Sequence, residues 1–247
     1  MVLPVYRNRA TVEDLYARLC RTLTDVTPAF ELIFVDDACP EASRDVVASL
    51  VARDPRVRAI ILAENVGQHR AVLTGLSHVR GQHVVVMDAD LQDPPEAVAE
   101  LLRARDGEMG VVFAGRRGHY ESRGRLATSR AFKTALHLVS GAPRDAGMFF
   151  VAGRTAVERV LTLGWRRPFV VAMLAAVGSP VRSIPVERMP RPCGDSSYSA
   201  LGRVRSASLA LAAAALHRVT PAWWHLSRGA ARPPVAAYLG EGFEDTT

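Results

Sequence analysis

Several features that would assign a protein class at once are missing from this sequence of 247 residues. Its three cysteines are widely spaced and match neither a disulfide framework nor a zinc-binding pattern, which favours a reducing compartment. No apolar run reaches the roughly 20 residues that a membrane-spanning helix needs, and the nearest, residues 207–216, is too short. The chain opens on the strand-like segment VLPVY rather than on a secretory signal peptide. We therefore expect a cytoplasmic protein.

Glycine-rich nucleotide-binding motifs are also absent. The sequence has neither G-x-G-x-x-G after a first strand nor a Walker A motif, so a dinucleotide or P-loop fold has little support. Lysine occurs once, at Lys133, and the net charge of +6 comes chiefly from arginine. Such a balance favours anionic partners, such as nucleotides, lipid phosphates or a membrane surface. No nucleic-acid recognition motif is present, so we expect no nucleic-acid partner.

The first half alternates between two periodicities. Short apolar runs at residues 2–6, 30–35, 57–62, 83–87 and 110–114 are typical of buried strands. Amphipathic helical patterns separate them, which predicts βαβ units and right-handed crossovers. The predicted fold class is α/β, with a Rossmann-like, mostly parallel sheet flanked by helices. Beyond residue 120 the pattern is less regular, with candidate helices at 126–139, 156–163, 169–176 and 203–219 and candidate strands at 148–152 and 181–186.

Ligands of open parallel sheets bind beyond the carboxyl ends of the strands. Three polar clusters fall at such ends: the loop after Tyr6, the pair Asp36-Asp37, and residues 88–92. We expect one crevice to hold all three. The alternative for Asp36-Asp37 is a turn and an N-cap for the next helix. His69 and Arg70, in the helix that follows the third strand, are interpreted as ordinary helix-surface residues.

The segment HVVVMDADLQDPPE, residues 83–96, is the most informative stretch. Asp88 and Asp90 are two residues apart, so in an extended segment both carboxylates point to the same side. Two carboxylates and the Gln92 amide oxygen at a strand end suit Mg²⁺ or Mn²⁺, which usually keeps positions for substrate phosphates. The alternative is turn and N-cap chemistry, and a bare Asp-x-Asp is a weak signal. The longer string DADLQDPPE is far more specific.

Seven stretches follow one another in a characteristic order: PVY (4–6), FVDD (34–37), ENVGQHRAVLTGL (64–76), DADLQDPPE (88–96), GRR (115–117), DAGMF (145–149) and RPCGDSSYS (191–199). With them the chain resembles family 2 glycosyltransferases of the GT-A fold. Within that family it is most similar to dolichol-phosphate mannose synthases and bacterial polyprenyl-phosphate glycosyltransferases. The resemblance covers about residues 2–218 and implies a single GT-A domain over residues 1–220. The Gly-, Pro- and acid-rich end of the chain predicts a flexible C-terminal tail over residues 221–247.

The resemblance implies a nucleotide-sugar site that agrees with the three polar clusters. Asp37 would contact the nucleobase, and Asp88 would lie near the ribose and the cation. The implied donor-binding residues are Pro4, Tyr6, Asp37, Gln68, Asp88 and Asp90, and the implied ligands of the cation are Asp88, Asp90 and Gln92. For Gln68 the alternative is an ordinary helix start, where backbone N–H groups also favour a phosphate.

An acceptor phosphate would need cations. A polyprenyl phosphate carries its nucleophilic oxygen as an anion, so positioning matters more than a strong base, and arginine forks suit phosphate oxygens. By resemblance, Arg117 and Arg130 lie near this phosphate, and the loop that carries Arg191, Ser197 and Tyr198 closes over the site. The alternative is a solvated basic helix in an arginine-biased protein.

Asp145 is the third candidate catalytic residue, beside Arg117 and Arg130. It could serve as general base for a hydroxyl acceptor. The alternative is a turn carboxylate that orients Arg144 or the metal loop.

Some positions depart from the family pattern. Arg7-Asn8 replaces the usual Asn-Glu, and Ala38-Cys39 replaces the usual Gly-Ser. Ser197 stands where a lysine is common. These departures put the contacts around the nucleobase and the acceptor in doubt.

The resulting hypothesis is metal-dependent, inverting transfer of a sugar from a UDP- or GDP-linked donor to polyprenyl phosphate. Many bacterial relatives continue into transmembrane helices and this chain does not, so the same chemistry on a soluble small-molecule acceptor stays open. A second alternative is a non-catalytic nucleotide-sugar-binding subunit. The segment 203–224, with Trp223-Trp224, is a candidate peripheral contact to the inner face of the membrane. Its alternative is a packed terminal helix.

Overall fold

The computed structural model describes residues 1–105, 110–117, 123–165, 167–189 and 233–241, with residues 211, 212, 215 and 243. The strands are β1 (Val2–Val5), β2 (Leu32–Asp36), β3 (Val57–Leu62), β4 (His83–Val86), β5 (Val111–Arg117), β6 (Phe150–Gly153), β7 (Val181–Glu187) and β8 (Val235–Leu239). The helices are α1 (Arg9–Thr24), α2 (Ser43–Arg53), α3 (Gln68–Leu76), α4 (Ala97–Ala104), α5 (Arg123–Ser140), α6 (Arg154–Thr162) and α7 (Val170–Ala176).

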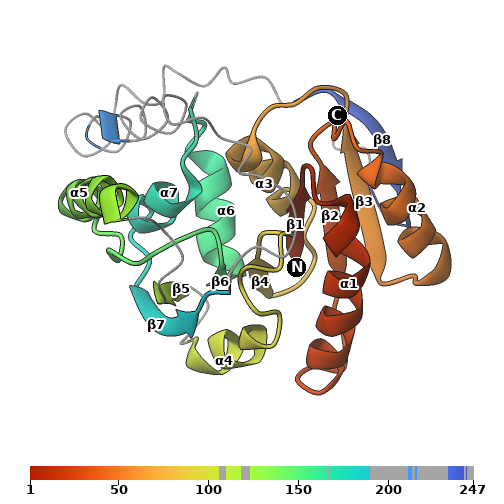
Figure 1. Cartoon of the computed structure of the whole chain (residues 1–247), viewed down its shortest axis with the longest axis horizontal. Coiled ribbons are helices and arrows are strands. Elements are labelled where there is room, and N and C mark those ends of the chain that lie inside the picture. The colour runs from red at the N-terminus through yellow and green to blue at the C-terminus, as the bar shows by residue number, and fades with distance from the viewer. Residues whose placement is uncertain are drawn as a thin grey trace.

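One eight-stranded sheet organises these elements, in the order β7-β5-β6-β4-β1-β2-β3-β8 (Figure 1). Four of its seven strand pairs are parallel: β1 with β2, β1 with β4, β2 with β3, and β5 with β7. The α/β class with a mostly parallel sheet is therefore confirmed. One detail differs, because β6 lies between β4 and β5 and is antiparallel to both.

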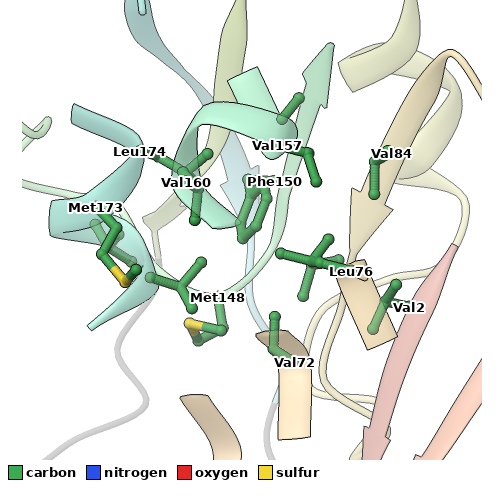
Figure 2. Packing of buried hydrophobic residues seen from close by; sticks show 14 of the residues in the cluster. Val2, Val72, Leu76, Val84, Met148, Phe150, Val157, Val160, Met173 and Leu174 are labelled. Carbon is green, nitrogen blue, oxygen red and sulfur yellow. The ribbon is translucent and has the colours of Figure 1, made fainter. Parts of the chain in front are cut away.

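Helices cover both faces of the sheet, and strand alternation divides the core into two layers. Val2 belongs to the layer that also contains side chains of α3, α6 and α7, and the next residue, Leu3, belongs to the layer with side chains of α1, α2 and α4. Figure 2 shows the first layer, where Phe150 of β6 packs among side chains of α3 and α6. Both layers are formed by fully buried aliphatic and aromatic side chains, so the sheet is a rigid platform for the loops at its edges.

The strand β8 was not predicted. It pairs antiparallel with β3, and the rings of Tyr238 and Phe243 lie 5.3 and 5.4 Å from the ring of His78. The guanidinium of Arg58 lies 4.1 Å from the Phe243 ring. The expectation of a flexible tail over residues 221–247 is therefore wrong for Val235–Leu239, because backbone pairing and ring contacts fix this segment.

The boundary expected at residue 220 stays a prediction, because residues 216–232 lie outside the described part of the chain. The segment 203–224 is also largely outside it, with only residues 211, 212 and 215 described. Among the helices of the described residues, none combines the length and the apolar character that crossing a membrane requires.

Candidate active site

The carboxyl ends of β1, β2 and β4 meet at one edge of the sheet. Val5 is in register with Asp36, and the backbone N–H of Asp37 donates to the Val5 carbonyl at 3.0 Å. On the other side of β1, the Met87 N–H donates to the Val2 carbonyl at 3.3 Å. The structure thus brings the three polar loops of the sequence to one edge.

Asp37 is buried and holds the loop that precedes α3. Its Oδ1 accepts the Val66 N–H at 2.7 Å, and its Oδ2 accepts the Gly67 N–H at 3.0 Å. Gly67 has φ of +85°, a backbone conformation that favours glycine. Burial raises the pKa of Asp37, and the two N–H groups oppose that shift. The carboxylate therefore ties the end of β2 to the start of α3.

Asp36 does not cap α2, since that helix has Ala42 as its N-cap residue and no side-chain cap. Its Oδ1 instead accepts the Cys39 N–H at 2.8 Å and closes a turn. Within the described residues, its buried Oδ2 has no hydrogen-bond partner. Burial raises the pKa of Asp36. Of the alternatives for this pair, the turn is confirmed and the helix cap is wrong.

Pro4 lies in β1, in register with Val35, and Tyr6 follows the strand. The Tyr6 N–H donates to Asn8 Oδ1 at 3.3 Å, and the Arg7 guanidinium lies 5.5 Å from the Tyr6 ring. The Arg7 N–H donates to Cys39 Sγ at 3.1 Å. The two departures from the family pattern, at Arg7 and Cys39, are thus in direct contact across the ends of β1 and β2.

Gln68 and Asp88 connect α3 to β4. The Gln68 side-chain Nε2 donates to Asp88 Oδ1 across the edge of the sheet. Gln68 is the first residue of α3 and follows the loop that Asp37 holds. A continuous set of hydrogen bonds therefore runs from β2 through the start of α3 to the end of β4.

The segment after β4 turns instead of staying extended. Residues 89–93 form a turn and bends, and Leu91 has φ of +56°. Asp90 is buried, and its Oδ1 accepts the Gln92 N–H at 3.1 Å. The Thr11 hydroxyl of α1 donates to the Ala89 carbonyl at 2.5 Å. The expectation that Asp88 and Asp90 share one side of an extended strand is therefore wrong, because the strand ends at Val86.

Arg188, which the sequence reasoning did not select, contacts this turn. Its Nη2 lies 3.9 Å from Asp90 Oδ2, and its Nε lies 3.5 Å from Oδ1 of the buried Asp93. The next N–H, of Met189, donates to the Gln92 carbonyl at 2.8 Å. The chain that leaves β7 is therefore fastened to the turn that carries Asp90 and Gln92.

The donor set of this turn suits a hard cation. Asp88, Asp90 and Gln92 offer carboxylate and amide oxygens, the atoms that Mg²⁺ and Mn²⁺ prefer. Among the described residues, no group of three or more His, Cys, Asp or Glu side chains could hold a metal ion by itself. A cation bound with a nucleoside diphosphate needs only one or two protein carboxylates, since phosphates complete its shell. The residues fit a cation of that kind.

Asp145 lies against β5 at the same edge. The Ala114 N–H donates to the Phe149 carbonyl at 2.9 Å, which joins the end of β5 to the segment before β6. A methyl group on Gly115 would lie 2.2 Å from Asp145 Oδ2, so the carboxylate occupies the space beside that glycine. The main chain of Arg117 ends β5, in register with Glu187.

The remaining candidate residues have side chains that lie outside the described part of the structure. Arg130 lies within α5, but the side chains of Arg117 and Arg130 are outside the described part. The acceptor-loop residues Arg191, Ser197 and Tyr198 lie outside the described residues altogether.

Curated relatives share this chain's sequence over much of its length. An undecaprenyl-phosphate 4-deoxy-4-formamido-L-arabinose transferase from Salmonella choleraesuis (strain SC-B67) is 29% identical over 202 residues. The alignment covers 81% of this chain and 62% of that protein. Proteins of the same name from Salmonella paratyphi B and Salmonella newport have the same identity and coverage. The chain therefore spans less than two thirds of the length of these relatives.

Solved structures share its fold. Mannosyl-3-phosphoglycerate synthase from Rubrobacter xylanophilus gives a TM-score of 0.58 at 18% identity, with 89% of this chain and 73% of that chain covered. Glucosyl-3-phosphoglycerate synthase from Mycobacterium tuberculosis, in complex with Mn²⁺, UDP and glucosyl-3-phosphoglycerate, gives 0.55 at 20% identity, with 88% and 78% covered. A mannosyltransferase from Pyrobaculum calidifontis, in complex with GDP-mannose and Mn²⁺, gives 0.54 at 18% identity, with 92% and 71% covered. The fold is that of GT-A glycosyltransferases.

The family itself is identified by the sequence. Residues 1–162, which run from β1 to the end of α6 and include every described candidate residue, match the family described as glycosyl transferase family 2. This chain belongs to glycosyl transferase family 2.

Proposed function

We propose that this protein is a metal-dependent, inverting glycosyltransferase that moves a sugar from a UDP- or GDP-linked donor to polyprenyl phosphate. The observation that carries the proposal is the hydrogen-bonded edge of the sheet in a family 2 chain, where Asp37 holds the loop before α3, Gln68 donates to Asp88, and Asp90 is held in the turn that follows. The names of the curated relatives supply the acceptor class.

The donor would bind along this edge. Asp37 and the loop it holds would receive the nucleobase, together with Pro4 and Tyr6. Asp88, Asp90 and Gln92 would hold Mg²⁺ or Mn²⁺, which when bound neutralises the charge that develops on the departing diphosphate. Gln68 fixes the Asp88 carboxylate, and Gln92 with Arg188 fixes the Asp90 carboxylate, so both groups are oriented before the donor arrives.

The acceptor would approach from the side of β5 and α5. A phosphate oxygen attacks the anomeric carbon in line as the bond from that carbon to the diphosphate oxygen breaks, which inverts the configuration. Because this oxygen is already an anion, Arg117, Arg130 and Arg191 would act by positioning it. The loop of Ser197 and Tyr198 would close over it. We place the enzyme in the cytoplasm, with the segment 203–224 as its contact to the membrane face.

Asp145 favours a second candidate, the same transfer to the hydroxyl of a soluble acceptor. Its carboxylate is held at the reacting edge beside Gly115, where a general base for a hydroxyl would stand. A polyprenyl phosphate would not need that base. An Asp145→Asn protein that transfers sugar to polyprenyl phosphate at nearly the original rate, and not to a hydroxyl acceptor, would separate the two roles.

The test is transfer of labelled sugar from UDP- and GDP-linked donors to undecaprenyl phosphate by the purified chain. We expect turnover to stop with EDTA and to return with Mn²⁺ or Mg²⁺, and Asp90→Asn to abolish it. Asp45→Asn, an exposed carboxylate on α2, is the matched control. Full transfer by the Asp90→Asn protein would refute the metal assignment. Tight nucleotide binding without turnover on any acceptor would support a non-catalytic subunit instead.

A further inference from the structure

Gly115 occupies a position where glycine has no local advantage. It lies inside β5, in register with Pro185 of β7. Strand interiors disfavour glycine, because it contributes no packing and loses more backbone entropy than other residues. Its φ does not lie in the positive range that would require glycine. The reason for glycine must therefore be the space that its missing side chain leaves.

That space is filled by a carboxylate. A Cβ on Gly115 would lie 2.2 Å from Asp145 Oδ2 and 2.8 Å from Asp145 Cγ. Real Cβ atoms essentially never approach another heavy atom within 3.0 Å, so Asp145 Oδ2 would have to move by at least 0.8 Å. The next neighbour is the Ile184 carbonyl oxygen at 3.2 Å, which needs to give only a few tenths of an ångström. The side chain of Asp145 can rotate away, whereas the backbone of β7 has to shift only slightly.

We propose that Gly115 is a positioning residue, whose missing side chain forms the seat that holds the Asp145 carboxylate at the reacting edge of the sheet. The inference rests on the second candidate of the proposed function, transfer to a hydroxyl acceptor, since it assumes that Asp145 acts there as the general base. The methyl group of an alanine at position 115 would displace the carboxylate and leave the fold in place. Displacement of a reacting group by about 1 Å costs on the order of 100-fold in rate.

Two other glycines show what distinguishes this seat. A Cβ on Gly75 of α3 would lie 2.4 Å from Val2 Cγ1, so that glycine serves core packing. A Cβ on Gly81 would meet its nearest neighbour, the His83 carbonyl oxygen, at 3.5 Å, which is ordinary contact. Gly81→Ala is therefore a matched control for a glycine-to-alanine change without a steric conflict.

The experiment is a double-mutant cycle of the original protein, Gly115→Ala, Asp145→Ala and the double variant. For each protein we would measure kcat for sugar transfer to a hydroxyl acceptor, the Kd for UDP or GDP with Mn²⁺, and the midpoint of thermal unfolding. Gly115→Ala should lower kcat about 100-fold and leave the nucleotide Kd unchanged within about twofold. It should also lower the unfolding midpoint. In the Asp145→Ala protein, Gly115→Ala should lower neither kcat nor the unfolding midpoint any further.

The outcomes separate the seat from the proposed function. If Gly115→Ala has the same effect in the original protein and in the Asp145→Ala protein, the seat is refuted. The added methyl group would then clash with a group other than the Asp145 carboxylate. A full rate for Asp145→Ala overturns the positioning role. If none of the proteins transfers sugar to a hydroxyl acceptor, the second candidate function fails, and the stability cycle still decides whether Gly115 seats Asp145. Gly81→Ala should behave as the original protein throughout.

Discussion

Arg188 Nη2 lies 3.9 Å from Asp90 Oδ2, although 98 residues separate the two in the chain. The same guanidinium contacts Asp93, whose side chain is 1% exposed. Two buried carboxylates in one turn are stable only if a cation offsets their charge. The residue that follows β7 supplies that charge, so the turn that carries the candidate cation ligands depends on a strand from the far end of the sheet.

We therefore expect Arg188→Gln to destabilise the protein by about 3 kcal/mol, since it removes a buried positive charge that faces the carboxylates of Asp90 and Asp93. The same change should raise the KM for the sugar donor. Urea denaturation and initial-rate kinetics measure the two effects. Arg159→Gln, at an exposed arginine on α6, is the control and should change neither. An Arg188→Gln protein with the original midpoint would show that the guanidinium does not stabilise this turn.

Asp37 gives a second prediction. Its two oxygens accept separate backbone N–H groups, from Val66 and Gly67. An asparagine could accept only one of them and would turn its NH₂ group toward the other, so Asp37→Asn should cost about 1–3 kcal/mol. The loop before α3 should loosen, and the donor KM should rise more than kcat falls. Asp25→Asn, at the exposed end of α1, is the control, and an unchanged donor KM in Asp37→Asn would contradict the role of this loop.

The first half of the fold could be predicted well, because local sequence patterns specify its strands and helices. The strand at 57–62 has the predicted bounds, and β1, β2, β4 and β5 differ by a few residues at their ends. The antiparallel place of β6 could not be predicted, since strand order depends on packing between distant elements. β8 was missed because five apolar and aromatic residues between prolines and glycines carry little periodicity.

The candidate site shows the same division. The rule for parallel sheets placed Asp37 and Asp88 at one edge, and the structure brings them together. Arg188 had no local signal, because its role is a contact to a turn almost one hundred residues earlier. Gly115 belongs to the stretch GRR that carries part of the family resemblance, yet only the structure shows that Asp145 fills the space beside it.

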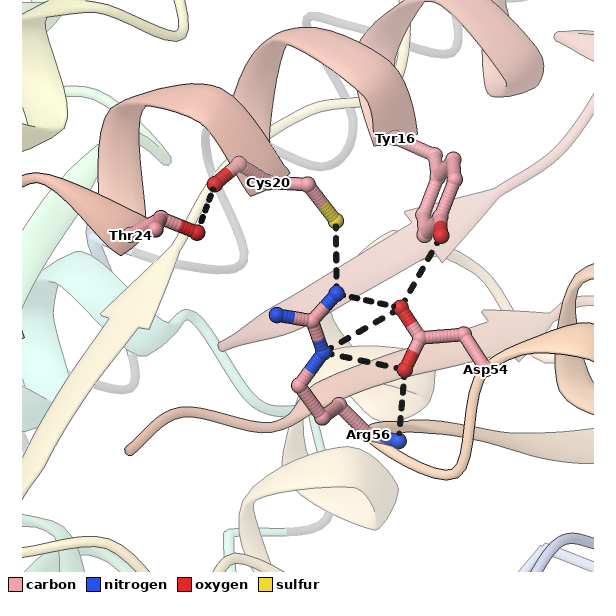
Figure 3. Close-up of polar contacts among 5 residues, drawn as sticks. All are labelled: Tyr16, Cys20, Thr24, Asp54 and Arg56. Atoms are coloured by element: carbon pink, nitrogen blue, oxygen red, sulfur yellow. Dashed lines mark hydrogen bonds and ion pairs between the residues drawn. The ribbon is translucent and has the colours of Figure 1, made fainter. Parts of the chain in front are cut away.

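A polar cluster at the opposite edge of the sheet should affect stability alone. Figure 3 shows Asp54, before β3, between Tyr16 of α1 and Arg56. The Tyr16 hydroxyl donates to Asp54 Oδ2 at 2.9 Å, and the Arg56 Nη2 donates to the same oxygen at 2.8 Å. The Arg56 guanidinium lowers the pKa of Asp54 to about 2. The charged carboxylate therefore stabilises the fold at neutral pH.

Asp54→Asn should lower the free energy of unfolding by about 1–2 kcal/mol at pH 7 and leave transfer activity intact. Because the folded pKa lies below the unfolded value of about 3.9, this contribution is complete above pH 4 and is lost as pH falls toward 2. The difference between variant and original protein in urea denaturation should therefore shrink over that range. A difference that stays constant with pH would mean that the negative charge of Asp54 does not contribute to the free energy of unfolding. Asp45→Asn is the exposed control.

His69 corrects one expectation and supplies the last prediction. It was interpreted as a helix-surface residue, but its ring lies 4.6 Å from the Phe169 ring, and its Nδ1 accepts the Val170 N–H at 3.4 Å. It thus joins the start of α3, beside the donor edge, to the start of α7. Burial lowers the pKa of His69 to about 4, so the imidazole stays neutral where it would be half protonated in an unfolded chain.

Since the folded pKa lies below the unfolded value of about 6.5, the unfolded chain binds the extra proton and stability falls as pH drops from 6.5 toward 4. The slope from this one group is at most about 1.4 kcal/mol per pH unit. His69→Phe keeps an aromatic ring against Phe169 and removes the titration. Its free energy of unfolding, measured between pH 6.5 and 5, should therefore depend less on pH than that of the original protein. His83→Gln, which removes an exposed histidine at the start of β4, is the control, and both variants are compared with the slope of the original protein. If the free energy of unfolding of His69→Phe depends on pH as steeply as that of the original protein, protonation of His69 is not the cause of the acid destabilisation.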